Sequence, residues 1–133
     1  MHTAFEVAEM PAIQALEVIR AGLPARAFEK VAAALDLSVD ELAGKLGVSP
    51  RTIRDQRMKR ARLSSENTEK LVRTARIQNQ ARRVFSTNEA VSGWLGSPSP
   101  ALDGSRPIDL LDTDLGSREV EAVINGIAFG NVM

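Results

Sequence analysis

The segment SVDELAGKLGVSPRTIRDQRMKRARLS, residues 38–64, carries the start and stop signals of short helices. Ser38 followed by Glu41 is a capping box, in which the serine oxygen and the glutamate carboxylate each accept a backbone N–H of the first turn. Gly47 then ends the helix, because glycine takes the left-handed cap conformation at little cost. These signals predict a helix from Val39 to Leu46.

Ser49 and Pro50 mark the start of a second helix. Serine is a favoured N-cap, and proline suits the first helical position because its missing N–H costs nothing there. A helix, the turn Gly47-Val48-Ser49 and a second helix within about twenty residues have the spacing of a helix-turn-helix. We expect Ile53 to anchor the second helix to the core, with Met58 beneath it.

The second helix is strongly basic, although the chain of 133 residues has no net charge. The segment from Arg51 to Arg62 holds six Lys/Arg and a single acid. Residues 51–86 carry eleven basic against three acidic residues, whereas residues 1–50 carry four against seven and residues 87–133 carry two against seven. A basic middle between acidic ends predicts two surfaces with different partners.

The basic helix has two interpretations, a DNA-reading helix or a solvated charged helix without a partner. In a helix-turn-helix, the N-terminal half of the second helix lies in the major groove, where arginine can grip a guanine edge with two hydrogen bonds. Basic residues further along can hold phosphates. The capped turn in front of the helix favours DNA. The predicted DNA-contacting residues are Ser49, Arg51, Thr52, Arg54, Asp55, Arg57, Lys59, Arg60 and Arg62.

The remaining chain also reads as helices, since it has no Val/Ile/Thr-rich alternating runs. Apolar spacing predicts helical structure over residues 4–21 with a break at Pro11, and Pro24 can open the next helix. Ser64 caps a long helix toward Phe85. Basic residues on that helix either extend the phosphate contacts or keep it soluble; they are Lys70, Arg73, Arg76, Arg82 and Arg83.

Short helices and a Pro-rich loop are expected in the C-terminal part. Thr87 or Asn88 can cap a short helix, and residues 97–107, which include three prolines, should form a loop. Pro107–Leu111 should form a single helical turn, and Thr113 can cap a last helix from residue 114 to about residue 129. The fold class predicted by these signals is all-α.

Several function classes are disfavoured by composition. The chain has no cysteine and one histidine, His2, and it has no Gly-rich phosphate loop, so we do not expect an enzyme or any catalytic residue, cofactor or metal. Asp109, Asp112 and Asp114 could suggest a cation site, but helix capping and solvated charge explain them better. No apolar run spans a bilayer and no secretory leader is visible, so a cytoplasmic protein without a membrane partner is expected.

The C-terminal stretch from Asn88 to Gly130 resembles the toxin-binding domain of the Xre/MbcA/ParS-type antitoxins. The upstream stretch LAGKLGVSPRTIRDQRMKRARLSSENTEKLVRTARI is similar to the Xre-like DNA-binding half of the same family. Ser99-Pro100 stands where Asn-Pro is common, and Asp103-Gly104 where a glycine pair is common. The resembling C-terminal features are Trp94-Leu95, Pro100-Ala101-Leu102, Gly104, Pro107, Leu110-Leu111-Asp112-Thr113, Gly116, Val120 and Ile127 to Gly130.

This resemblance implies a type II antitoxin, with a helix-turn-helix DNA-binding half followed by a small helical toxin-binding half. Its cognate toxin would be a RES-domain or ParT-like protein that consumes NAD, by degrading it or by transferring ADP-ribose. Either the Asp103–Arg106 loop or the tail Gly130-Asn131-Val132-Met133 would enter the toxin's NAD pocket. The implied toxin-binding residues are Trp94, Leu102, Asp103, Arg106, Leu110, Asp112, Arg118, Glu121, Asn125, Phe129, Asn131 and Met133.

Three parts are therefore expected: an N-terminal helical extension over residues 1–22, an Xre-like helix-turn-helix domain over 23–86 and a toxin-binding domain over 87–133. We expect the basic domain to carry its own core. A helix-turn-helix that reads operator DNA needs two half-sites, which predicts a homodimer. The competing class is a stand-alone Xre-family transcriptional repressor, which leaves the C-terminal stretch unexplained.

Overall fold

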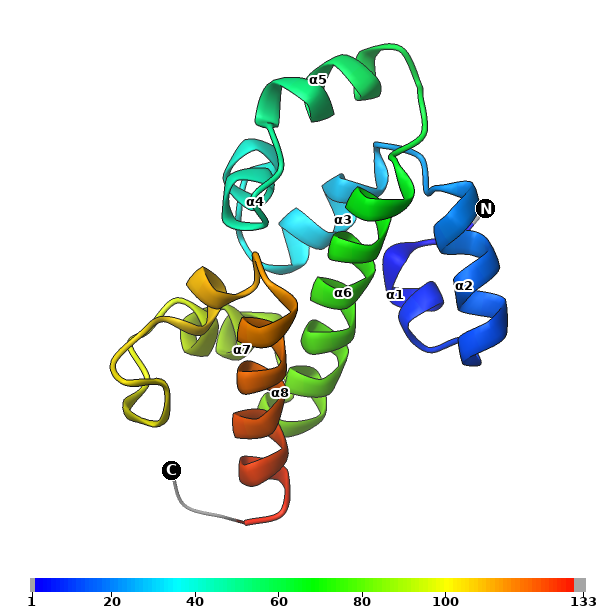
Figure 1. The fold of residues 1–133 in the computed structure, drawn as a ribbon. Coiled ribbons are helices and arrows are strands. Elements are labelled where there is room, and N and C mark those ends of the chain that lie inside the picture. The colour runs from blue at the N-terminus through cyan, green and yellow to red at the C-terminus, as the bar shows by residue number, and fades with distance from the viewer. Residues whose placement is uncertain (1, 131–133) are drawn as a thin grey trace.

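The computed structural model describes residues 2–130, and within that range the fold is all-α, as predicted (Figure 1). The one β-type pairing there is an isolated bridge between Pro24 and Arg62. No helix in this part of the chain combines the length and the apolar character that crossing a bilayer requires. The elements are α1 (Ala4–Ala8), α2 (Ala12–Ala21), α3 (Ala27–Ala34), α4 (Val39–Lys45), α5 (Pro50–Met58), α6 (Ser65–Phe85), α7 (Asn88–Leu95), the 3-10 helices η1 (Pro100–Leu102) and η2 (Pro107–Leu110), and α8 (Asp114–Ala128).

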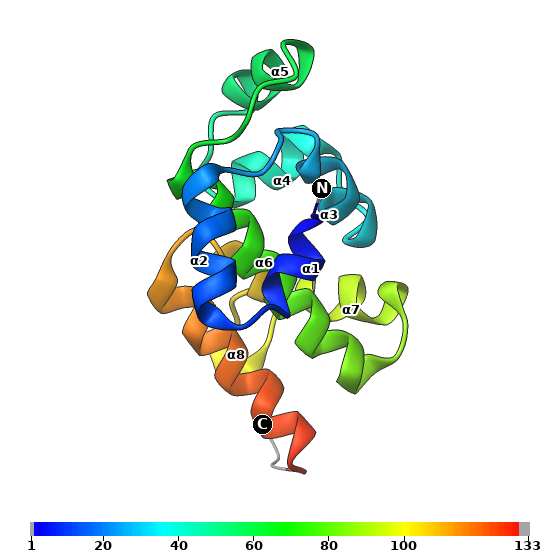
Figure 2. The same cartoon turned by 90° about the vertical axis from the view of Figure 1, so that its right-hand side faces the viewer.

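The long helix α6 lies at the centre of the molecule. Helices α1 and α2 pack on one side of it, and α7 and α8 pack on the other (Figures 1 and 2). Leu71, Ala75 and Ile77 of α6 are fully buried within one hydrophobic cluster. The cluster includes residues of every α-helix from α1 to α8 except α2, and apolar side chains of α2 are partly buried against this cluster. The buried residues of the basic part are therefore continuous with those of the two ends of the chain, because α6 packs against both.

The predicted helix starts are confirmed by their hydrogen bonds. The Ser38 N–H donates to Glu41 Oε1 at 2.9 Å, and the Glu41 N–H donates to Ser38 Oγ at 3.0 Å, which completes the capping box. The hydrogen bonds from the backbone and side chain of Ser38 lower the pKa of the Glu41 carboxyl below its ordinary value. Gly47 follows the end of α4 and has a φ of +70°, in the left-handed region.

The start of α3 differs from the prediction, since it begins at Ala27 and not at Pro24. Residues 23–25 run extended beside residues 61–63 instead. The Leu63 N–H donates to the Leu23 carbonyl at 2.7 Å, and the Ala25 N–H donates to the Ala61 carbonyl at 3.0 Å. This crossing ties the segment before α3 to the connection between α5 and α6, and it uses backbone groups that local sequence signals do not reveal.

The C-terminal part follows the predicted order, with one addition. The expected loop over residues 97–107 contains η1, which begins at Pro100 and buries Leu102. Thr113 caps α8 by accepting the Gly116 N–H on its Oγ1 at 3.0 Å, and Gly130 follows that helix with a φ of +78°. The apolar face of α8, formed by Val120, Val123 and Ile124, is buried against the centre of the molecule.

Candidate functional site

Helix α5 projects at one end of the molecule and packs mainly on α4 (Figure 1). Ser49 caps it by accepting the Thr52 N–H at 3.3 Å, and Ile53 is its fully buried anchor. Met58 does not lie beneath Ile53, because its side chain is 83% exposed at the end of the helix. Thr52 and Asp55 are exposed on the outer surface, as are Arg51 and Arg54.

Two of the predicted DNA-contacting arginines are paired with carboxylates from other helices. Arg54 Nη1 lies 2.6 Å from Asp40 Oδ2, which comes from the first turn of α4. Arg57 contacts Glu29 Oε2 of α3 through Nη2 at 3.0 Å and Nε at 3.1 Å. These carboxylates hold both guanidinium groups in defined positions on the surface around α5.

The other predicted cations of this segment divide into two kinds. Arg51, Lys59 and Arg60 are exposed, and their side chains make no hydrogen bond or ion pair with any other residue in the range 2–130. Arg62 is also exposed, but its Nη1 donates to the Gly22 carbonyl at 2.7 Å. Arg62 therefore holds the end of α2 against the connection that follows α5.

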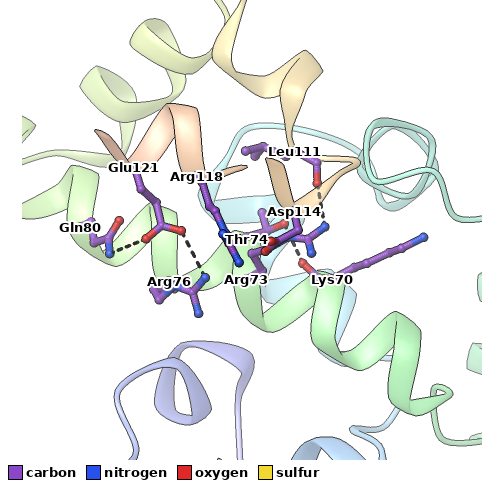
Figure 3. Close-up of polar contacts among 9 residues, drawn as sticks. All are labelled: Lys70, Arg73, Thr74, Arg76, Gln80, Leu111, Asp114, Arg118 and Glu121. Atoms are coloured by element: carbon purple, nitrogen blue, oxygen red, sulfur yellow. Dashed lines mark hydrogen bonds and ion pairs between the residues drawn. The ribbon is translucent and has the colours of Figure 1, made fainter. Parts of the chain in front are cut away.

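Two basic side chains of α6, those of Arg73 and Arg76, contact the C-terminal part of the chain (Figure 3). Arg73 Nη2 donates to the Leu111 carbonyl at 3.3 Å, and Arg76 Nη2 lies 3.2 Å from Glu121 Oε1 of α8. Gln80 Nε2 donates to the second oxygen of Glu121 at 3.3 Å. Arg73 and Arg76 are thus neither free for phosphates nor merely solvated.

The ends of α6 show the same pattern. Arg82 Nη1 donates to Asn88 Oδ1 at 2.8 Å, and Arg83 forms an ion pair with Glu9 at the end of α1. Lys70 lies 3.8 Å from Glu66, one turn earlier on the helix. The contacts of Arg82 and Arg83 fasten the central helix to the start of α7 and to the end of α1, whereas the Lys70 pair lies within α6.

The three aspartates between η2 and α8 are not grouped around a cation site. Asp109 forms an ion pair with Lys45 at the end of α4, and Asp114 pairs with Arg118 at 2.9 Å. Asp112 lies beside the turn of the helix-turn-helix: a Cβ on Gly47 would be 3.7 Å from its Cβ. Residues 2–130 contain no cluster of His, Asp and Glu that could hold a metal ion.

The C-terminal residues implied by the resemblance differ in exposure. Trp94 is half-buried and lies against Phe85, with ring centroids 5.5 Å apart, and Leu110 is half-buried too. Leu102 is only 8% exposed, so its side chain belongs to the core. Glu121 is occupied by its contacts with α6, while Asn131 and Met133 lie outside the described residues. The exposed members are Asp103, Arg106, Asp112, Arg118, Asn125 and Phe129.

Exposed apolar side chains also line up along α8, and of these only Phe129 is among the toxin-binding residues implied by the resemblance. Leu115 is 71% exposed and Phe129 is 83% exposed, and Ala122 between them is exposed as well. A spacing of seven residues is about two helical turns, so Leu115, Ala122 and the C-cap residue Phe129 lie along one side of the helix, which we call the outer stripe of α8. The heptad spacing, opposite the buried face of the helix, could have revealed this stripe from the sequence.

The fold and these surfaces define an all-α protein with a helix-turn-helix at one end and a second helical part packed on the same central helix. Comparison with protein families is consistent with both parts. Residues 14–76 match the antitoxin Xre-like helix-turn-helix domain, and residues 80–130 match the antitoxin Xre/MbcA/ParS C-terminal toxin-binding domain. The chain belongs to the Xre/MbcA/ParS-type antitoxins and carries both of the family's domains.

Individual relatives agree with this assignment. The chain is 28% identical over 127 residues to a protein of Sphingobium sp. (strain YBL2) named Prs ADP-ribosylating antitoxin, covering 89% of this chain and 80% of that protein. It is 29% identical over 80 residues to Antitoxin Xre of Pseudomonas putida, covering 60% of this chain and 50% of that protein. Its fold is similar to a chain in the crystal structure of the M. tuberculosis MbcT-MbcA toxin-antitoxin complex, with a TM-score of 0.62 at 24% identity, covering 82% of this chain and 96% of that one.

Proposed function

We propose that this antitoxin neutralises an NAD-consuming toxin of the RES/ParT type by covering its active site. The observation that carries the proposal is the match of residues 80–130, which include all of α8, to the family's toxin-binding domain. The name of the Sphingobium relative refers to ADP-ribosylation, which supports an NAD-consuming partner. The chain itself acts by binding in the cytoplasm, without catalysis, cofactor or metal, and the chemistry belongs to the toxin.

The contact with the toxin is proposed to lie on the exposed C-terminal residues and on the outer stripe of α8. Leu115 and Phe129 are large apolar side chains that are mostly exposed, and an amphipathic helix commonly docks such a stripe into an apolar groove. Burying a leucine or phenylalanine contributes about 1.5–3 kcal/mol. Each of the two side chains therefore contributes a measurable part of the affinity.

Exposure-matched variants test this contact. Leu115→Ser and Ile13→Ser remove aliphatic side chains that are 71% and 72% exposed, on α8 and α2 respectively. Phe129→Ser and Met58→Ser remove side chains that are both 83% exposed, at the C-cap of α8 and at the last residue of α5. We expect the α8 variants to weaken toxin binding about ten- to hundredfold in a titration of purified proteins, and the Ile13 and Met58 variants to bind like the wild type.

The measurement uses the product of an adjacent RES-type gene, first co-expressed and co-purified with the wild-type chain. Failure of the wild type to capture that protein or to protect cells that express it would overturn the proposed neutralisation and favour the stand-alone repressor. Capture by the wild type with equal loss in all four serine variants would show that the outer stripe has no special role.

We further propose that α5 represses the antitoxin's own operon, with two copies of the chain on two half-sites. Support comes from Arg51, Arg54 and Arg57, which lie on a capped helix of a helix-turn-helix. The division at residues 22/23 and 86/87 into extension, DNA-binding part and toxin-binding part belongs to this proposal.

Binding of operator DNA measures this second activity. Arg51→Ala should cost about 1–3 kcal/mol on the operator if Arg51 reads a base, with little change on a scrambled duplex. A triple alanine variant of Arg51, Arg54 and Arg57 that keeps wild-type operator affinity would refute the assignment of α5. Light scattering with and without operator should detect the dimer, and a strict monomer under both conditions would contradict it.

A further inference from the structure

We propose that Arg26, together with Arg57 and Arg60, forms a cleft that holds one phosphate of the DNA backbone at the C-terminal end of α5. This inference rests on the proposed operator binding and adds a site to it. Arg26 precedes α3 and lies outside the helix-turn-helix segment, and its sequence context gives no sign of DNA contact. The fold alone brings it beside the basic helix.

The cleft lies between the start of α3 and the end of α5 and has a volume of about 430 Å³. It exists because the chain before α3 crosses the connection after α5, where the Ala25 N–H donates to the Ala61 carbonyl at 3.0 Å. Its charged lining consists of Arg26, Arg57, Arg60 and Glu29. The cleft opens to solvent, so a phosphate on a polymer can reach it.

Charge favours an anion in this cleft. The lining contains three arginines and one acidic residue, Glu29, whose carboxylate already accepts a hydrogen bond from Arg57 Nε and lies 3.0 Å from Arg57 Nη2. Arg60 has a left-handed backbone conformation, with a φ of +53°. Beside it, the Ala61 N–H donates to the Gln56 carbonyl at 2.8 Å. The planar fork of an arginine matches the oxygens of a phosphate, and it can donate two hydrogen bonds at once.

The position of the cleft selects backbone phosphate as the ligand. When the N-terminal half of α5 lies in the major groove, the far end of the helix approaches the sugar-phosphate strand that borders the groove. Arg57 and Arg60 come from that far end, and Arg26 widens the basic surface beyond the helix itself. Contacts of this kind set the register of the protein on DNA and carry no sequence information.

The salt dependence of binding tests the cleft. Each phosphate contact contributes about 0.9 to the slope of log affinity against log salt, so from about 50 to about 200 mM salt one contact accounts for about 3.5-fold in affinity. We expect Arg26→Ala to weaken binding to operator and scrambled duplexes alike. Over this salt range, the factor by which its affinity falls should be about 3.5 times smaller than the factor for the wild type. Arg60→Ala should behave in the same way, which guards against a folding defect specific to one variant.

Two further variants sharpen the measurement. Arg82→Ala removes one positive charge at the opposite end of α6, outside the cleft, and should leave the salt slope unchanged (Figure 1). Glu29→Gln removes the one carboxylate of the cleft and should tighten binding to both duplexes. Fluorescence anisotropy on the two duplexes measures all four variants.

The outcomes separate this inference from the proposed repression. Wild-type binding of the operator, with Arg26→Ala and Arg60→Ala matching Arg82→Ala in affinity and slope, would overturn the cleft alone. No binding of any duplex by the wild type would overturn both. Inorganic phosphate that raises the melting temperature of the wild type, with no loss of DNA binding in Arg26→Ala, would show a free-anion site and would also overturn the DNA assignment.

Discussion

Replacement of Gly116 by alanine should lower the stability of the protein, because the lost packing of α8 against η2 outweighs the higher helix propensity of alanine. Gly116 lies in the first turn of α8, and its N–H donates to the cap oxygen of Thr113. A Cβ built on Gly116 would lie 2.1 Å from the Leu110 carbonyl oxygen and 3.0 Å from the carbonyl carbon. Both atoms belong to the backbone of η2, so the contact is relieved only if η2 and α8 move apart.

Two opposing effects determine the size of the change. Alanine in a helix is favoured over glycine by about 1 kcal/mol. Forcing an extra methyl group into a packed contact typically costs about 1–3 kcal/mol, and a rigid backbone carbonyl at 2.1 Å places Gly116 at the upper end of that range. We expect a net loss of about 1–2 kcal/mol, which corresponds to a melting temperature lower by about 3–10 °C for a chain of this size.

The assay is thermal unfolding followed by circular dichroism, with Gly93→Ala as the matched control. Gly93 lies in α7, and a Cβ added there meets no atom within 4 Å. The control should therefore gain stability, by up to about 1 kcal/mol. If Gly116→Ala raised the melting temperature as much as Gly93→Ala does, the close approach of η2 to α8 would be refuted.

Three other perturbations test interactions that hold the elements together. Thr68→Val should cost about 1–3 kcal/mol in urea unfolding, because the buried Thr68 Oγ1 accepts the Leu23 N–H at 3.1 Å, and Thr68→Ser should retain most of the stability. Glu121→Ala should cost about 1 kcal/mol, since its ion pair with α6 is partly exposed, and the loss should shrink at high salt. Folding lowers the pKa of Glu41, so its carboxylate stabilises the folded state at pH values above the ordinary carboxyl pKa of 4.5. This contribution is lost as the pH falls through the lower pKa of the folded state. Glu41→Gln should therefore reduce the melting temperature at neutral pH and match the wild type in strong acid.

Local signals predicted the helices well because capping is a local interaction. Ser38, Ser49, Ser64 and Thr113 each accept the backbone N–H three residues ahead, as their positions before helical periodicity indicated. The crossing of residues 23–25 with residues 61–63 was not predictable in this way. Its hydrogen bonds join segments about forty residues apart, and nothing in either segment alone specifies the pairing.

The same distinction applies to the candidate surfaces. The exposed positions of α5 follow from one helical period and one buried anchor, Ile53, so the sequence was sufficient. The carboxylates that hold Arg54 and Arg57 come from other helices, and only the fold brings them there. The burial of Leu102 was not predictable for a related reason, because η1 turns this side chain into the core within a segment whose prolines indicate a loop.

The shared central helix restricts how such an antitoxin can acquire a new partner in evolution. One face of α6 packs on α1, and the other meets α8 through its apolar residues and through Glu121. Recombination between residues 86 and 87 of two diverged genes would place a foreign α8 on this helix and leave Arg76 and Gln80 without their acceptor. Substitutions confined to the outer stripe and to the Asp103–Arg106 loop leave these contacts of α6 intact. We therefore expect partner specificity to diverge by surface substitutions and not by exchange of whole domains.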